Sequence, residues 1–167
     1  MKERKLSYDY DELIRSGNGT LFEEHAGRLP LPNMLMMDRI TYISTESGKY
    51  NKGVIKAELD IKPELWFFAC HFKDDPVMPG SLGLDAMFQL TGFYLTYLGH
   101  EGKGRALGCD KLSFFGEVLP SNQIVSYEIN VKRVINLKMI MIIADGSMYV
   151  DGKEIYTVEN MKVGLYR

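Results

Sequence analysis

The residues from Ser81 to Leu98 read SLGLDAMFQLTGFYLTYL, and this stretch decides the fold. If it is helical, its apolar side chains cover nearly the whole circumference: Leu82, Leu84, Met87, Phe88, Leu90, Phe93, Tyr94, Leu95 and Leu98. A helix that is apolar all round is either buried in a core or spans a membrane. Asp85, Gln89, two threonines and two glycines fit a membrane span poorly. We therefore expect a buried helix and no membrane insertion.

The segments around this helix carry strand signals. Val125 to Val131 alternate strictly between apolar and polar residues, which is typical of a half-buried strand. Met34–Ile43 and Gly53–Asp60 have the β-branched and apolar content of strands. A sheet wrapped around one central apolar helix is the simplest architecture that buries both.

The last third of the chain predicts an antiparallel meander. An apolar run, Met139–Ala144, leads to Asp145-Gly146, and a second apolar segment leads to Asp151-Gly152. Asp-Gly between apolar residues favours a hairpin, most clearly at Val150–Lys153.

The N-terminal region is less regular. Tyr8–Arg15 (YDYDELIR) predicts a short helix that Ser16-Gly17 ends, and Gly27–Asn33 (GRLPLPN) predicts loop because two prolines and a glycine exclude helix. No repeat or linker interrupts the sequence, so we expect residues 1–167 to form one α+β domain.

Composition narrows the functional classes. Twenty basic and 22 acidic residues give a net charge of −2, which argues against nucleic acid as a partner. The start, MKERKLSYDYDEL, lacks the apolar region of a secretory signal. Cys70 and Cys109 are the only cysteines, too few for a disulfide framework and not spaced for zinc. These features favour a cytoplasmic protein with free thiols.

His71 is the first candidate for chemistry. It lies in WFFACHFKDDPVMPGSLGLDAMFQ, residues 66–89, just before a proline-bounded loop that leads into the apolar helix. A lone histidine there is more often a core residue bonded to a backbone carbonyl. A metal site with Asp74 or Asp75 is less favoured, since no second histidine has suitable spacing.

Asp85 strengthens the case. It lies four residues before Gln89, so the two side chains share one face of the helix. Apolar surroundings would raise the pKa of Asp85, which suits a proton donor near neutral pH. The alternative is a structural aspartate that Gln89 holds.

Pro79-Gly80 could supply a third element. Proline suits a helix entry, and glycine lets a ligand approach the backbone. Free amides there, helped by the helix dipole, could bind a carbonyl oxygen that gains negative charge, although a plain helix start explains the dipeptide equally well. A base, an acid and a carbonyl-binding amide are what the elimination of water β to a thioester requires.

A resemblance to a known family makes this interpretation specific. His71–Gly80 (HFKDDPVMPG), Leu84–Met87 (LDAM) and Gln89 closely resemble the 3-hydroxydecanoyl-acyl carrier protein dehydratases, which are dehydratase/isomerases of bacterial type II fatty acid synthesis. Further similar segments are Leu31–Arg39 (LPNMLMMDR), Leu65–Phe68 (LWFF), Gly102–Gly108 (GKGRALG) and Ala144–Gly146 (ADG).

The resemblance implies a hot-dog fold, a homodimer and active sites at the subunit interface. His71 of one chain would be the base and Asp85 of the other the acid. The Gly80 amide would bind the thioester carbonyl, the Val77 carbonyl would orient the imidazole, and Gln89 would hold Asp85. The acyl chain would occupy an apolar tunnel lined in part by residues near Phe72, Met78, Phe88 and Phe93. No metal or cofactor is implied, because the phosphopantetheine arm arrives with the substrate.

The resemblance also bears on specificity. Asp85 favours the isomerising family, since the general 3-hydroxyacyl-carrier dehydratases usually have Glu there, but Phe88 and Ser81 replace the family's Trp and Cys. The acidic carrier protein would dock on Lys132, Arg133 and Lys138, with Lys162 nearby, in a patch that Leu137 interrupts; ordinary solvated lysines are the alternative.

The function expected is therefore that of a hydro-lyase with trans-2/cis-3 isomerase activity. Three alternatives remain: a simple dehydratase, an acyl thioesterase on the same fold, and a carrier-binding scaffold without catalysis.

Overall fold

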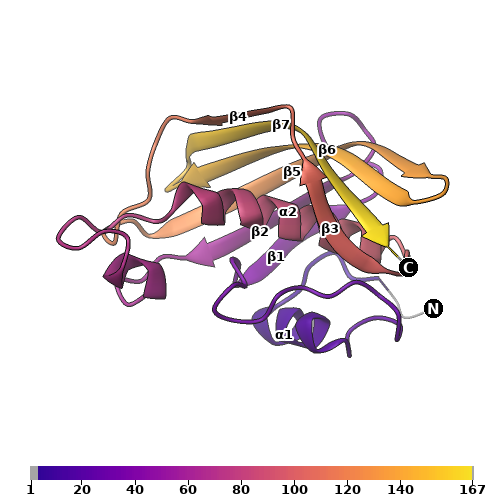
Figure 1. Cartoon of the computed structure of the whole chain (residues 1–167), viewed down its shortest axis with the longest axis horizontal. Coiled ribbons are helices and arrows are strands. Elements are labelled where there is room, and N and C mark those ends of the chain that lie inside the picture. Colours follow the sequence, from indigo (N-terminus) through magenta and orange to yellow (C-terminus); the bar gives the residue numbers. More distant parts are fainter. Residues whose placement is uncertain (1–3, 167) are drawn as a thin grey trace.

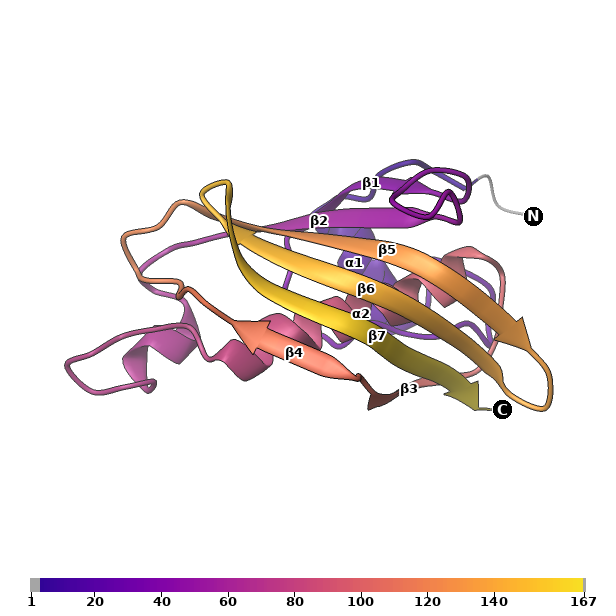
Figure 2. The ribbon, with the colours of Figure 1, turned by 90° about the horizontal axis from the view of Figure 1, so that it is seen from above.

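A computed structural model describes residues 4–166. It contains an antiparallel sheet of seven strands with α2 (Gly80–Tyr97) packed against one face (Figure 1). Neighbouring strands follow the order β1-β2-β5-β6-β7-β3, and β4 also pairs with β7. Viewed from above, the strands β5 to β7 lie across α2, and α1 lies on the same side of the sheet (Figure 2). The expected sheet wrapped around a central helix is confirmed.

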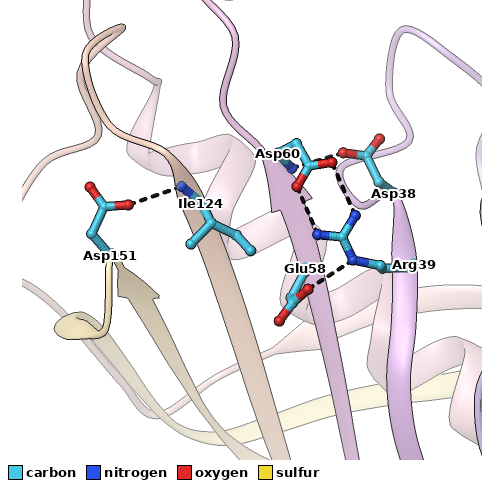
Figure 3. Close-up of polar contacts among 6 residues, drawn as sticks. All are labelled: Asp38, Arg39, Glu58, Asp60, Ile124 and Asp151. Atoms are coloured by element: carbon cyan, nitrogen blue, oxygen red, sulfur yellow. Dashed lines mark hydrogen bonds and ion pairs between the residues drawn. The ribbon is translucent and has the colours of Figure 1, made fainter.

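The strands differ widely in length. They are β1 (Arg39–Ser44), β2 (Val54–Asp60), β3 (Lys103–Gly108), β4 (Lys111–Phe114), β5 (Ile124–Asn136), β6 (Ile140–Val150) and β7 (Lys153–Tyr166). The predicted alternation in β5 is confirmed, because Val125, Tyr127, Ile129 and Val131 are all buried. The Asp151-Gly152 hairpin is also confirmed: both residues have positive φ, and the Asp151 carboxylate accepts the Ile124 amide at 2.9 Å (Figure 3).

Helix α2 is buried on most sides, as its sequence predicts. It approaches the sheet closely at Gly83, where an added Cβ would lie 2.6 Å from both the Met148 sulfur and the ring of Tyr156. Glycine here lets the helix lie directly on β6 and β7, which fixes the depth at which its first turn sits.

Three predicted boundaries were wrong. Helix α1 spans Tyr10–Asn18, because Asp9 and Glu12 form a capping box at its start and Gly19, in the left-handed conformation, ends it. Strand β1 starts at Arg39, not Met34. Asp145-Gly146 does not form a turn and lies inside β6. Gly146 is needed because a Cβ there would lie 2.8 Å from Met161 and 2.9 Å from Met87.

The start of β1 is held to β2 by an ionic cluster, to which the LPNMLMMDR segment contributes Asp38 and Arg39 (Figure 3). Arg39 donates to Glu58 at 2.8 Å and to both Asp60 oxygens at 2.7 and 3.0 Å, and Asp38 accepts the Asp60 amide at 2.8 Å. These bonds fix the segment before β1. The backbone of this segment is hydrogen-bonded to α2 at Met34 and Met36.

Candidate active site

His71 lies in a short loop that closes on itself. The 3-10 helix η1 (Trp66–Ala69) precedes it, and the His71 amide donates to the Phe67 carbonyl at 2.9 Å. Val77 then makes two contacts with His71: its amide donates to the His71 carbonyl at 2.8 Å, and its carbonyl lies 2.9 Å from Nδ1. The structure therefore contains the histidine–carbonyl contact that the family resemblance implies.

This contact fixes the imidazole's chemistry. A carbonyl oxygen can only accept, so Nδ1 carries a hydrogen, and the nitrogen that can act as a base is Nε2. The ring is half-buried, and the Phe72 ring lies beside it with centroids 4.1 Å apart. The contact thus orients His71 with Nε2 as the nitrogen that can take a proton.

The same loop leads directly into α2. The Met78 amide donates to the Val118 carbonyl at 2.9 Å, which ties the loop to the segment before β5. Pro79 is the N-cap residue and makes no side-chain cap, and Gly80 is the first helical residue. The amide of a first helical residue has no acceptor within its helix, and it lies at the positive end of the helix dipole. The Gly80 amide is therefore placed to receive an oxygen that gains negative charge.

Asp85 is held by Gln89, one turn further along α2. Gln89 Nε2 donates to Asp85 Oδ2 at 2.6 Å and to the Met34 carbonyl at 2.7 Å, while its Oε1 accepts the Met36 amide at 3.2 Å. Each atom of the Gln89 amide thus has a defined partner, which leaves one orientation for the group. The Asp85 carboxyl is half-buried and fixed from one side.

Asp85 faces a pocket of about 250 Å³ that it lines together with Phe88, Phe93, Gly92 and Leu29. Two of the four predicted tunnel residues, Phe88 and Phe93, are therefore on its wall. Phe72 and Met78 lie elsewhere: Phe72 is 55% exposed beside His71, and Met78 is buried behind the same loop. His71 does not line this pocket, so a single chain does not bring base and acid candidates into one cavity.

The pocket opens beside strand β3, which is exposed along its whole length and forms an edge of the sheet. Gly104, Arg105 and Ala106 of this strand line the pocket. Apolar side chains that are 40% to 53% exposed lie nearby. They are Leu107 on β3, Phe114 at the end of β4, and Phe115, which follows it. An exposed edge with apolar neighbours is a surface that a second chain can cover.

Three of the four predicted docking residues share one hollow. Lys132, Arg133 and Lys162 line a cavity of about 440 Å³, together with Lys52, which no sequence pattern indicates. A register shift in β5 between Val131 and Arg133 allows adjacent basic residues to face the same side. Lys138 does not line the cavity and lies at the β5–β6 turn beside Leu137, which is 81% exposed.

Acidic partners neutralise part of this basic surface. Lys132 lies 2.9 Å from Asp145, and Lys162 lies 2.6 Å from Asp110. The hydrogen bond from Lys162, followed by that from Asn160, lowers the pKa of Asp110, so this pair stays ionised at neutral pH. Arg133 is exposed and has no ion pair among the residues described. Lys52, in the same hollow, is likewise exposed and without an ion pair among these residues, so Arg133 and Lys52 are both available to an acidic partner.

Two further features are absent from residues 4–166. No group of three or more His, Cys, Asp or Glu side chains there could hold a metal ion. Within the same range, no helix is long and apolar enough to span a membrane.

A family model matches most of the chain. Residues 29–159 match the FabA-like domain family, a range that contains His71, Gly80, Asp85 and Gln89.

Three solved structures resemble the fold at low identity. A chain of the dehydratase heterocomplex ApeI:P from Xenorhabdus doucetiae is 13% identical, with 83% of this chain and 88% of that chain covered and a TM-score of 0.61. The dehydratase domain from the CurJ module of curacin polyketide synthase is 10% identical, with 96% and 49% covered and a TM-score of 0.64. A proposed thioesterase from Shewanella oneidensis is 9% identical, with 94% and 97% covered and a TM-score of 0.55. At these identities the structures bear on the fold alone.

Proposed function

This chain belongs to the FabA-like domain family, and from that premise we propose that it dehydrates 3-hydroxyacyl thioesters carried on acyl carrier protein. The observation that carries the proposal is the closed loop from His71 to Val77. One short segment there orients the imidazole through Nδ1, which leaves Nε2 as the base, and ends at Gly80, the first residue of α2. A base and a carbonyl-binding amide are thereby fixed relative to each other.

The elimination follows from these positions. The Gly80 amide binds the thioester carbonyl oxygen, which acidifies the proton on C2. His71 Nε2 removes that proton, and the charge moves onto the carbonyl oxygen at the positive end of α2. The enolate then collapses, the C3–O bond breaks, and Asp85, as the general acid, gives a proton to the departing hydroxyl. The products are a trans-2-enoyl thioester and water, and proton exchange with solvent restores both residues.

We further propose that each site uses two chains, with His71 from one and Asp85 from the other. In a single chain Asp85 lines the Phe88–Phe93 pocket and His71 does not. The exposed edge strand β3 beside that pocket gives a second copy a surface on which to bind. A second chain bound there would close the apolar tunnel and bring its own His71 to Asp85.

Isomerisation is a further step at the same site. Asp85 instead of Glu supports it by resemblance to the isomerising family. His71 would remove a proton from C4 of the enoyl thioester and return it to C2, which moves the double bond to the cis-3 position. No bound metal or cofactor is required for either step.

Product analysis tests this proposal. We would incubate the protein with 3-hydroxydecanoyl thioester on acyl carrier protein and identify the products by mass spectrometry and NMR. Trans-2-decenoyl thioester supports the dehydratase, and an additional cis-3 product supports isomerisation. Free fatty acid and thiol without enoyl product would replace the proposal with a thioesterase, and unchanged substrate would favour a carrier-binding scaffold.

A further inference from the structure

Tyr156 lies beside the first turn of α2. No sequence pattern indicates it as a site residue. It belongs to β7, pairs in register with Phe114 of β4, and its ring meets the Phe114 ring edge-on with centroids 4.5 Å apart. Its ring packs under Gly83, and its hydroxyl extends toward Gly80: a Cβ added to Gly80 would lie 3.4 Å from the hydroxyl oxygen. The Tyr156 hydroxyl and the Gly80 amide are therefore close enough to reach one shared acceptor.

The Tyr156 hydroxyl has no hydrogen-bond partner among residues 4–166, although the residue is only 2% exposed. In comparison, the buried Tyr127 donates to Met36 at 3.0 Å and the buried Tyr94 donates to Ser44 at 3.1 Å. An unpaired buried hydroxyl costs free energy unless something outside the chain satisfies it.

The hydroxyl oxygen of Tyr156 is nevertheless not fully buried. Within the described part of the chain, only the Ser16 hydroxyl is both unpaired and closed to solvent. The Tyr156 oxygen therefore keeps some exposed surface, and it lies next to Gly80 at the start of α2.

The protonation state suits a donor. Burial, reinforced by the negative charge of Glu117, raises the pKa of Tyr156, so its hydroxyl keeps its hydrogen at neutral pH. It stands next to the positive end of a helix, where an acceptor that gains negative charge is favoured.

We propose that the Tyr156 hydroxyl is a second hydrogen-bond donor, beside the Gly80 amide, to the thioester carbonyl oxygen of the substrate. This rests on the proposed function, because it assigns the carbonyl to that position. Both donors bind a neutral carbonyl first and strengthen as the oxygen becomes an enolate, so Tyr156 contributes mainly to kcat.

Tyr156→Phe removes only the hydroxyl, and Tyr94→Phe is the matched control, since it also removes one hydroxyl from a buried tyrosine. With the N-acetylcysteamine thioester of 3-hydroxydecanoate, Tyr156→Phe should lower kcat about tenfold to a hundredfold with little change in KM. Tyr94→Phe should leave both unchanged. In thermal unfolding the order reverses: Tyr94→Phe loses a real hydrogen bond and melts earlier, whereas Tyr156→Phe does not.

Infrared spectroscopy of bound trans-2-decenoyl N-acetylcysteamine thioester, labelled with ¹³C at the carbonyl, separates this inference from the proposed function. The carbonyl band should move to higher frequency in Tyr156→Phe and stay in place in Tyr94→Phe.

An active wild type with unchanged band and kcat in Tyr156→Phe would overturn the role of Tyr156 alone. A Tyr156-dependent band in a wild type that performs no dehydration would support the role of Tyr156 and remove the dehydratase. A wild type that neither binds nor converts thioesters would overturn both, and early melting of Tyr156→Phe would show a structural partner and overturn the role of Tyr156.

Discussion

Gln89 holds Asp85 through Nε2 at 2.6 Å, while the same amide bonds the backbone of Met34 and Met36. The orientation of a half-buried carboxyl on α2 is thereby tied to the segment before β1, which lies 53 and 55 residues before Gln89 at its two contacts. The Arg39 cluster anchors that segment to β2. The position of the proposed acid therefore depends on the sheet as much as on its own helix.

Gln89→Leu should reduce both activity and stability. It leaves the Met36 amide and the Met34 carbonyl without their partner, which costs about 1–3 kcal/mol in the free energy of unfolding. It also frees Asp85 to rotate, so kcat should fall further than stability alone explains. Urea unfolding and steady-state kinetics measure the two effects. Gln123→Leu, at an exposed position, is the control and should change neither.

A composite site predicts complementation between two inactive variants. His71→Ala and Asp85→Asn should each abolish dehydration, followed by the ultraviolet absorbance of the enoyl thioester, while the proteins stay folded. If the variants exchange chains freely, half of the dimers are mixed and each mixed dimer keeps one intact site. The mixture should then recover about a quarter of wild-type activity. Sites contained in one chain would give no recovery, and substantial activity in either variant alone would remove the assignment of acid and base.

Two glycines of α2 should respond oppositely to alanine. At Gly83 a Cβ would lie 2.6 Å from Met148 and Tyr156, so Gly83→Ala must push the helix from the sheet and should cost about 1–3 kcal/mol. At Gly92 the nearest atom would be 3.8 Å away, so Gly92→Ala should stabilise the protein by about 0.5–1 kcal/mol through helix propensity. Thermal unfolding compares them directly. Equal effects at the two positions would contradict the close packing at Gly83.

The sequence predicts α2 within one residue at each end, because an unbroken apolar circumference has few explanations. It misses β3 and β4. In GKGRALG no apolar alternation exists to detect, since β3 is an edge strand whose residues are all exposed. The prediction of a turn at Asp145-Gly146 is also wrong. Gly146 is required because the side chains of Met87 and Met161 leave no room for a Cβ, and the sequence does not distinguish such a glycine from a turn glycine.

Some residues of the candidate site are predictable from local sequence, and others are not. His71, Gly80, Asp85 and Gln89 lie within one stretch of 19 residues, so local sequence is enough to propose them. Tyr156 and Lys52 come from distant segments, and only the pairing of β7 with β4 and the folding of the sheet bring them to their positions. The contribution of a second chain likewise has no local signature.

The Arg39–Asp60 pair predicts a pH dependence of stability. The hydrogen bond from Arg39 lowers the pKa of Asp60 in the folded state. A lowered pKa gives stability that is fully present above the unfolded value, about 3.9, and is lost as the pH falls through the folded value. Because Asp60 is 43% exposed, the contribution should stay below about 1 kcal/mol. Urea unfolding should show Arg39→Met less stable than wild type at pH 7, with the gap narrowing below pH 4. A gap that stays constant to pH 2 would mean that Arg39 acts through packing.

Arg133 provides the clearest test of carrier docking. It is exposed in the hollow beside Lys132 and Lys162, whose charges are partly offset by Asp145 and Asp110. Arg133→Glu should raise KM for a substrate on acyl carrier protein about tenfold, because reversing one charge at an interface costs roughly 1.5 kcal/mol or more. It should leave KM for the small N-acetylcysteamine thioester unchanged.

Lys153→Glu makes the same change in net charge at the exposed β6–β7 hairpin and is the matched control. Added salt should shrink the difference between carrier-bound substrate kinetics of wild type and Arg133→Glu, because exposed charges are screened. Equal effects of the two variants would show that net charge alone matters, and an effect on the small thioester would place Arg133 at the reaction site and not at a docking surface.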